Sequence, residues 1–294
     1  MANVKKQEIG EFYNKVGWQS EGDGLYQNAE YEDLRDVSKR YIAHAHERVG
    51  KHLPKTGKFL LDAGSGPVQY KAYEKYSEGY EKRVCADLSY VAMQEARKKL
   101  GDKGFYVVAD VANLPFRKEA FDGIVSLHTI HHLPIEEKGG AYIDMYQCLK
   151  PGGTMVTVDG WGEHKLYSFW QKVIALARRL RGAPKHSQTN QIEAHQATAD
   201  ETTPKQNGPA GTHVVKTSAA WFKSVIGDKL PWQIRSWRSV SVRFLREVVP
   251  DNCFGKFLLL NLSWLEDCFP RYFGENGQYP LIVFRKPKRD GAKE

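Results

Sequence analysis

Residues Lys58–Pro67, KFLLDAGSGP, decide the fold of this chain. The apolar run at residues 59–61 is short and continuous, which is typical of a central strand buried on both faces. Asp62 ends the run, and Gly64 and Gly66 then mark a tight turn in which backbone can approach a ligand, because no Cβ stands in the way. Since open α/β sheets bind ligands at the carboxyl ends of their strands, the stretch predicts the nucleotide loop of a Rossmann-like α/β fold.

Two further predicted strands end in an acid. Arg83–Asp87, RVCAD, predicts a second strand, and Tyr106–Asp110, YVVAD, predicts a third. A carboxylate after the second strand can accept both hydroxyls of a ribose, and one after the third can accept an exocyclic adenine amino group. The dinucleotide fingerprint requires a third glycine where this chain has Gln69. The pattern therefore favours adenosine carrying a charged amino-acid tail over a pyrophosphate.

Four motifs occur in order over about residues 58–159: LLDAGSGP, VCADLS, VVADVANLPFRKEAFDGIVS and LKPGGTMVTVD. With these motifs the chain resembles the class I S-adenosylmethionine (SAM) dependent methyltransferases, in the group that includes the ubiquinone/menaquinone C-methyltransferases. The resemblance implies a seven-stranded, mostly parallel sheet with helices on both faces, in the order 3-2-1-4-5-7-6 with the seventh strand antiparallel. One departure is Val68, which stands where the first motif of the family has its last glycine.

The resemblance also implies the cofactor, SAM, and the residues that hold it. Carried onto this sequence, these are Asp62, Ala63, Gly64, Ser65, Gly66, Asp87, Leu88, Asp110, Val111 and Leu127. Asp159 and Glu163 are too few for the clustered acids of metal-dependent catechol methylation, so no metal site is expected.

Composition places the chain among ordinary globular proteins. With 294 residues, 41% hydrophobic and 27% charged, one large domain with additions is expected. The first residues lack the apolar core of a secretory signal, and no apolar run reaches the roughly 18 residues of a membrane span. The cysteines at 85, 148, 253 and 268 lack CxxC spacing, which indicates free thiols and a cytoplasmic location.

The formal net charge of +8 indicates an anionic partner or a solvated basic surface. Much of the charge lies at residues 165–185 and 235–246 and in the C-terminal tail, without the aromatic interleaving of a nucleic-acid surface. The chain also lacks the Asp/Asn-Pro-Pro-aromatic motif of amino-group DNA methylation and the Pro-Cys of cytosine C5 methylation. A nucleic-acid acceptor is therefore not expected.

Five regions are predicted along the chain: an N-terminal helical lid (1–57), a SAM-binding core (58–160), a helical insertion (161–230) with a mobile linker (182–216), a C-terminal part of the sheet with a buried helix (231–287) and a basic tail (288–294). Within the lid, residues 8–30 are expected to cover the cofactor, and Glu32–Val49 to be helical. The linker is polar and has no aromatic residue.

Apolar periodicity predicts the remaining elements. Helices are expected at 91–100, 134–149, 163–181 and 218–226, and strands at 121–127, at 154–159, within 232–244 and at 279–284. Phe254–Phe269 is apolar nearly all round, which predicts a buried helix. The helix at 163–181 has one apolar face and a basic remainder, so it either packs internally or lies at a membrane surface.

The stretch Leu127–Pro134, LHTIHHLP, follows the fourth predicted strand and so lies at the mouth of the cofactor cleft. Its His128, His131 and His132 carry side chains whose ordinary pKa is near neutral, and one of them could act as a general base. Each could instead bond backbone or cap the next helix. Tyr13 and Tyr26 in the lid are the next choices.

Three functions remain open at this stage. The first is a cytoplasmic enzyme that methylates a small molecule at oxygen, carbon or nitrogen by in-line displacement. The second is a peripheral membrane enzyme that methylates a quinone or another lipid through contacts at residues 163–181. The third is a protein that binds SAM without catalysis.

Overall fold

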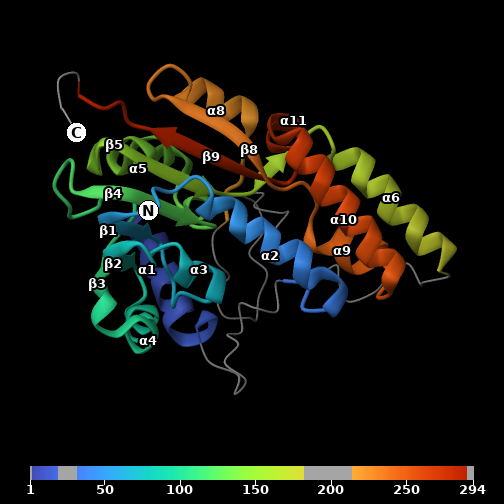
Figure 1. Cartoon of the computed structure of the whole chain (residues 1–294), viewed down its shortest axis with the longest axis horizontal. Helices are drawn as coiled ribbons and strands as arrows, with labels where there is room; N and C mark the ends of the chain where they lie inside the picture. The colour runs from blue at the N-terminus through green and yellow to red at the C-terminus, as the bar shows by residue number, and fades with distance from the viewer. Residues whose placement is uncertain (1, 19–31, 182–213, 290–294) are drawn as a thin grey trace.

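The computed structural model describes residues 2–18, 32–181 and 214–289. A seven-stranded sheet forms its centre, with the order β3-β2-β1-β4-β5-β9-β8 (Figure 1). All neighbouring strands are parallel except that β9 runs antiparallel to both β5 and β8. The predicted Rossmann-like sheet and its strand order are therefore confirmed. The strands are β1 (Gly57–Ala63), β2 (Tyr80–Asp87), β3 (Gly104–Val108), β4 (Phe121–Leu127), β5 (Leu149–Val158), β8 (Trp232–Arg238) and β9 (Tyr279–Arg285).

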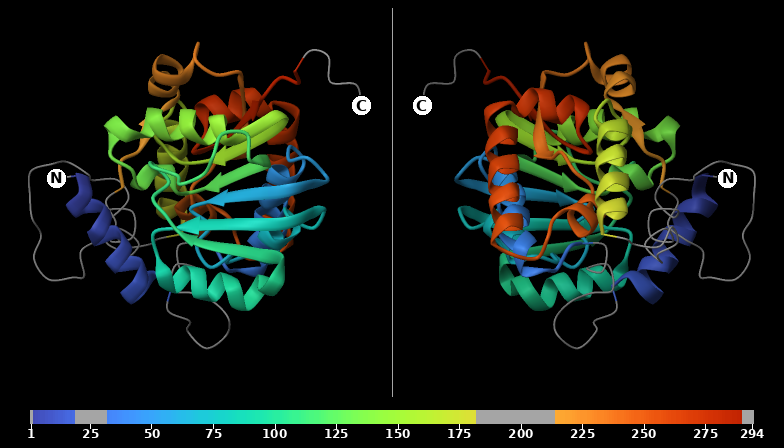
Figure 2. Two further views of the ribbon diagram at one scale, coloured as in Figure 1. Left: turned by 90° about the vertical axis from the view of Figure 1, so that its left-hand side faces the viewer. Right: turned by 90° about the vertical axis from the view of Figure 1, so that its right-hand side faces the viewer.

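Helices cover both faces of this sheet (Figure 2). Strands β6 (Trp161–Glu163) and β7 (Thr217–Ser218) are parallel and form a separate two-stranded sheet. Helical turns at Tyr13–Gly17 and Ile130–His132 adjoin the carboxyl ends of the strands. The α-helices are α1 (Ala2–Phe12), α2 (Asp36–Gly50), α3 (Lys71–Lys75), α4 (Tyr90–Leu100), α5 (Ile135–Cys148), α6 (Tyr167–Leu180), α8 (Ala219–Ile226), α9 (Val242–Val248), α10 (Cys253–Cys268) and α11 (Pro270–Asn276).

Strand β1 is buried on both faces, as its apolar run predicts. Leu61 joins a hydrophobic cluster with residues of α5 and α8, whereas Leu60 joins a cluster on the other face with residues of α2. Both leucines are fully buried. Successive side chains of a strand point to opposite faces, so two adjacent leucines fix helices on the two sides of the sheet.

A third cluster lies outside the sheet, where α6, α9 and α10 meet the N-terminal half of α2. Its buried members include Tyr41 of α2, Ile174 of α6, Leu245 of α9 and Leu259 of α10. Figure 2 shows α6 and α10 on the same side of the molecule, facing the viewer in the right-hand view. No helix in the described ranges is both long and apolar enough to cross a membrane.

The prediction that Phe254–Phe269 forms a buried helix is wrong. The helix exists as α10, but only Gly255, Leu259, Ser263 and Glu266 are buried in it. The apolar residues between them face outward, because α10 packs as an outer helix whose inner surface carries the polar contacts described below. An all-round apolar sequence cannot show which side of a helix is covered.

Several predicted boundaries also shift. The third strand ends at Val108 and leaves Asp110 in the following loop. Strand β5 begins at Leu149, before the Pro-Gly-Gly turn, because Leu149 already pairs with Phe121 of β4. Helix α6 begins at Tyr167 because residues 161–163 pair with β7.

The stretch predicted to hold the sixth strand contains two elements. Strand β8 ends at Arg238, and Ser241 then caps α9 by accepting the Phe244 amide at 3.1 Å. Residues 19–31, 182–213 and 290–294 lie outside the described ranges, so most of the predicted linker and basic tail and part of the predicted lid are not tested. All four cysteines are free, as expected.

Candidate functional site

A cavity of about 290 Å³ opens at the carboxyl ends of β1, β2 and β4. This is the edge where a parallel sheet of this topology binds ligands. The cavity has two halves. One is lined by the glycine loop after β1 and by residues after β2 and β3, and the other by histidines, aromatic rings and the ends of β8 and β9. The predicted cofactor residues that line it are Gly64, Ser65, Gly66, Asp87, Leu88, Asp110, Val111 and Leu127.

The glycines of the loop have a steric role. Gly64 has a φ of 76° and Gly66 a φ of 51°, values that glycine adopts without strain. A Cβ on Gly64 would lie 2.2 Å from the side chain of Thr129, and one on Gly66 would lie 2.9 Å from the ring of Trp18. The loop therefore passes directly between two side chains and keeps its backbone open to the cavity.

Asp87 closes β2 and braces this loop. Its carboxylate accepts the amide of Gly66 at 2.9 Å through Oδ2 and the amide of Ser89 at 2.9 Å through Oδ1. Burial raises the pKa of Asp87, although these amide hydrogen bonds oppose the rise. Each carboxylate oxygen keeps a lone pair beyond its amide bond, so Asp87 can accept ribose hydroxyls while it holds the loop.

The third predicted acid and its neighbours form the next part of the wall. Asp110 accepts the amide of Ala112 at 2.9 Å and lines the cavity beside the apolar side chains of Leu88 and Val111. This combination of a carboxylate with apolar surfaces suits a flat base that carries an amino group. The glycine loop, Asp87 and Asp110 together fit SAM.

Asp62 and Ala63 are not among the residues that line the cavity. Asp62 instead forms a buried ion pair with Arg83 of β2, whose Nε lies 3.2 Å from Oδ2. The guanidinium also donates to the carbonyl of Tyr73. The contacts of Asp62 therefore place it in the support beneath the glycine loop.

The three histidines have different partners. His131 lines the cavity, and its Nδ1 lies 2.5 Å from Oδ1 of Asp159, the residue that follows β5. Burial raises the pKa of Asp159, but His131, Lys138 and the Gly160 amide outweigh it and hold the pKa below its ordinary value. Because the carboxylate stays ionised, Nδ1 carries the proton that it donates to Asp159, and Nε2 is left as the proton acceptor of the ring.

His128 lies deeper, against the rings of Trp237 and Tyr279 at centroid distances of 4.8 and 5.7 Å. Its φ of 54° is unusual for a residue with a side chain, and its amide donates to Val158 at 2.7 Å. Burial lowers the pKa of His128 to about 3. A histidine with this pKa stays neutral and is a weak base at neutral pH.

His132 meets the N-terminal segment. Its Nε2 lies 3.0 Å from the hydroxyl of Tyr13, whose ring stacks on Trp18 with a centroid distance of 5.2 Å. Ile9, Phe12, Tyr13 and Trp18 all line the cavity. The N-terminal segment thus contributes four side chains to the wall of the cavity, whereas Tyr26 lies outside the described residues.

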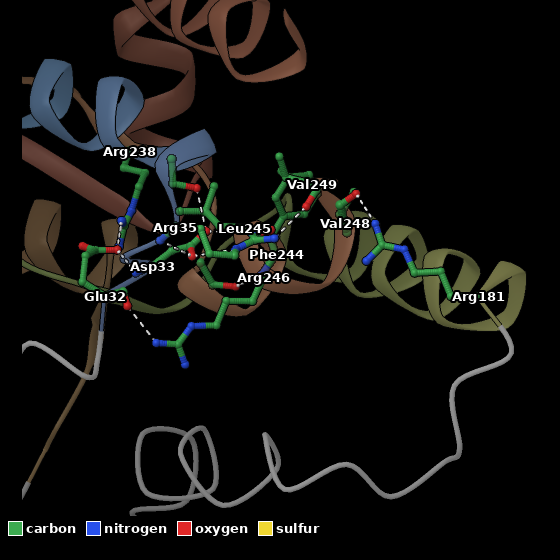
Figure 3. A network of polar contacts seen from close by, with 12 residues as sticks. Glu32, Asp33, Arg35, Arg181, Arg238, Phe244, Leu245, Arg246, Val248 and Val249 are labelled. Carbon is green, nitrogen blue, oxygen red and sulfur yellow. Dashed lines mark hydrogen bonds and ion pairs between the residues drawn. The ribbon is translucent and has the colours of Figure 1, made fainter. Parts of the chain in front are cut away.

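The far end of the cavity is formed by Trp237, Arg238 and Tyr279. The guanidinium of Arg238 lies 5.0 Å from the ring of Trp237 and 4.9 Å from that of Tyr279, and its Nη1 lies 2.7 Å from Oε1 of Glu32. Figure 3 shows this pair beside Arg246, which donates to the carbonyl of Glu32 at 2.7 Å. Within the described part of the chain, Nε of the buried Arg238 has no hydrogen-bond partner.

The last three residues of the predicted mobile linker belong to this wall. Val214 and Lys216 line the cavity, and the amide of Val215 donates to the carbonyl of His131 at 2.8 Å. The ammonium of Lys138 donates to the carbonyl of Val215. The expectation of a mobile linker is therefore wrong at residues 214–216, because backbone bonds fix them to the histidine stretch.

Asp159 was not predicted as a partner of histidine, and Arg238, Glu32 and Lys216 were not predicted as site residues. Asp159 shares the pattern of the three predicted acids, a carboxylate directly after a parallel strand, so it could have been found. The others had no local signal because Glu32, Lys216 and Arg238 are far from the histidines in sequence.

Comparison with known proteins shows what the core of the chain is similar to. Residues 61–157 match the model of a family described as a methyltransferase domain. An uncharacterized methyltransferase of Geobacillus sp. (strain WCH70) is 32% identical over 130 residues, which cover 44% of this chain and 57% of that protein. The ubiquinone/menaquinone biosynthesis C-methyltransferase UbiE of Pectobacterium carotovorum is 31% identical over 104 residues, 34% of this chain and 40% of that protein.

A tRNA (carboxymethyluridine(34)-5-O)-methyltransferase of Arabidopsis thaliana is 27% identical over 143 residues, 42% of this chain and 33% of that protein. The chain thus spans 33–57% of the length of these relatives. Among solved structures, a geranyl diphosphate methyltransferase in complex with GPP and sinefungin superposes with a TM-score of 0.56 at 16% identity, over 96% of this chain and 99% of that one. At this identity the likeness shows the fold.

Proposed function

Because residues 61–157 carry a methyltransferase domain of the class I, SAM-dependent type, we propose that this protein transfers a methyl group to a small-molecule acceptor at the far half of the cavity. The observation that carries the proposal is the His131–Asp159 pair, because its histidine lines the same cavity as the glycine loop and its carboxylate orients the ring from behind. A protein that only bound the cofactor would not need an oriented proton acceptor there.

The walls of the cavity support a small acceptor with an apolar or aromatic body. Tyr70, Tyr73, Trp237 and Tyr279 supply flat apolar surfaces, and Nε of Arg238 offers a donor with no other partner among the described residues. Buried polar groups without partners are costly, so a ligand group that accepts this N–H is favoured. We therefore expect an acceptor with an oxygen function at the end opposite the methylated atom.

Bound SAM supplies an electrophilic methyl group attached to a sulfonium. The protein positions the acceptor and removes its proton: Nε2 of His131 takes the proton from the nucleophilic oxygen, nitrogen or carbon, and the Asp159 carboxylate stabilises the imidazolium that results. Tyr13 and Trp18 cover the site, which excludes water and strengthens these electrostatic interactions.

The test is an untargeted screen. Purified protein is incubated with SAM carrying a labelled methyl group and with a pool of small aromatic, isoprenoid and phenolic compounds, and labelled products are identified by mass spectrometry. We expect at least one labelled product with the wild type and none with a His131→Ala protein that still binds S-adenosylhomocysteine. Labelled products at equal rates from both proteins would rule out the proposed base.

Two other acceptors are distinguished by the same assay. A quinone precursor in vesicles is added to the pool because the relative UbiE is named for quinone biosynthesis. Total tRNA is added because the Arabidopsis relative is named as a tRNA methyltransferase. Labelling of tRNA but of no small molecule would replace the small-molecule proposal.

A further inference from the structure

Helix α10 exposes large apolar side chains that have no cover in the described structure. Phe254, Phe257, Leu260 and Trp264 are 60, 60, 51 and 61% exposed, and we call these four residues the α10 face. More apolar side chains flank it along α10 and α11, namely Leu258, Leu265, Phe269 and Tyr272, all at least 36% exposed. Single exposed apolar residues are ordinary on a surface, but a contiguous group marks an interaction site.

The outward direction of this face is fixed from the inside. Glu266, on the opposite side of α10, is fully buried and accepts the hydroxyl of Tyr41 at 2.7 Å and the amide of Ser239 at 2.7 Å. The guanidinium of Arg48 lies 2.7 Å from the other carboxylate oxygen. Turning α10 to hide its phenylalanines would expose Glu266 and break its ion pair with the buried Arg48, which is strongly unfavourable.

The segments outside the described residues contain few large apolar side chains. Residues 182–213 contain no aromatic residue and only one large aliphatic residue, Ile192, and residues 290–294 contain neither. Residues 19–31 supply only Leu25, Tyr26 and Tyr31. Their sequences therefore offer little apolar surface to match the α10 face.

The charge beside the face indicates the chemistry of that occupant. Helix α6 lies on the same side of the molecule (Figure 2) and contains no acidic residue. The helix and its C-cap expose Lys172, Arg179 and Arg181. The helix also exposes Phe169, Leu176 and Leu180. Apolar and aromatic side chains next to long cationic ones are the composition of surfaces that lie in the headgroup region of a bilayer.

We propose that the α10 face, together with α6, docks on a membrane that contains anionic lipids. The phenylalanines, Leu260 and Trp264 enter the boundary between headgroups and acyl chains, and the α6 cations contact lipid phosphates. A two-fold dimer of this chain fits less well, because a symmetric interface sets each surface against itself and would bring the α6 cations together. The docking proposal goes beyond the proposed function and does not depend on which acceptor is methylated.

The test is flotation of the full chain with vesicles of phosphatidylcholine alone or with phosphatidylserine added. We expect flotation with the anionic vesicles only, weakened by high salt. A Phe257→Glu/Trp264→Glu variant should have a partition coefficient onto anionic vesicles at least about tenfold lower than that of the wild type. The reason is that two aromatic side chains that the wild type buries in the membrane are absent from the variant. A Lys172→Glu/Arg179→Glu variant should lose the preference for phosphatidylserine.

The matched control is Phe105→Glu, which makes the same change at a half-exposed phenylalanine of the edge strand β3. It should float like the wild type, and circular dichroism and S-adenosylhomocysteine binding should show that every variant is folded. If the double aromatic variant does not fold, Phe257→Ser alone replaces it. Wild type that fails to float, equal loss in the Phe105→Glu control, or a dimer in solution that Phe257→Glu/Trp264→Glu dissociates would each overturn the proposal.

Discussion

Nδ1 of His131 lies 2.5 Å from Oδ1 of Asp159, across the ends of two neighbouring parallel strands. The pairing of Leu127 with Val158 sets the carboxyl ends of β4 and β5 level, so the residues that follow them meet. The carboxylate fixes both the tautomer and the orientation of the imidazole, which is how a histidine is prepared to accept a proton at a defined atom.

Replacing Asp159 with asparagine should lower turnover by roughly 10²–10⁴-fold once an acceptor is known. The amide can donate to Nδ1 and so favours the tautomer in which Nε2 carries the proton and cannot accept another. S-adenosylhomocysteine affinity, measured by calorimetry, should stay within about threefold of wild type, since the carboxylate lies outside the cofactor half of the cavity. Glu163→Gln, an exposed change on β6, is the control; full activity of Asp159→Asn would remove the pair from the mechanism.

Asp87→Ala should weaken S-adenosylhomocysteine binding roughly ten- to a hundredfold, because a charge-assisted hydrogen bond of about 1.5–3 kcal/mol is lost. The loop should loosen as well, since the Gly66 amide loses its acceptor. Calorimetry on a protein shown to be folded measures the affinity. Asp102→Ala, an exposed acid after α4, should bind normally; equal affinities of the two variants would contradict the ribose assignment.

Asp62→Asn should lower the free energy of unfolding by about 3–5 kcal/mol, because it leaves the buried Arg83 without its charge partner. Urea unfolding measures the loss. The double variant Asp62→Leu/Arg83→Met should recover much of it, because both charges leave the interior together. If Asp62→Asn kept its stability and lost only cofactor affinity, Asp62 would be a binding residue and not a support.

His46 should make the protein less stable in mild acid. Burial lowers the pKa of its imidazole in the folded state from 6.5 to about 3, so the unfolded chain takes up the proton first. Stability is therefore fully present above about pH 6.5 and falls toward pH 3, by up to about 1.4 kcal/mol per pH unit from this group.

His46→Phe keeps a flat ring at this buried site, where His46 stacks on Trp237, and removes the titration. Urea unfolding between pH 4 and 8 should show a shallower pH slope for His46→Phe below pH 6.5 and parallel curves above it. Identical slopes across the whole range would contradict the buried neutral imidazole.

The sequence alone determined the central strands, the glycine loop and the acids at 87 and 110, whereas the strand order was expected only from the resemblance to a family. These follow from short-range patterns, because a buried parallel strand needs a continuous apolar run and the residue after it must lie at the ligand-binding edge. The same patterns placed three histidines at the cavity, but they could not distinguish among them.

Tertiary structure decided how the surroundings of those histidines differ and which side of α10 is exposed. His131 differs from His128 only because Asp159 lies on the adjoining strand end, whereas Trp237 and Tyr279 surround His128. Likewise, the composition of α10 predicted burial, and the contact of Glu266 with Tyr41 and Arg48 turned its apolar side outward. Such contacts join residues far apart in the chain, and local periodicity cannot encode them because it records only which neighbours in sequence share a face.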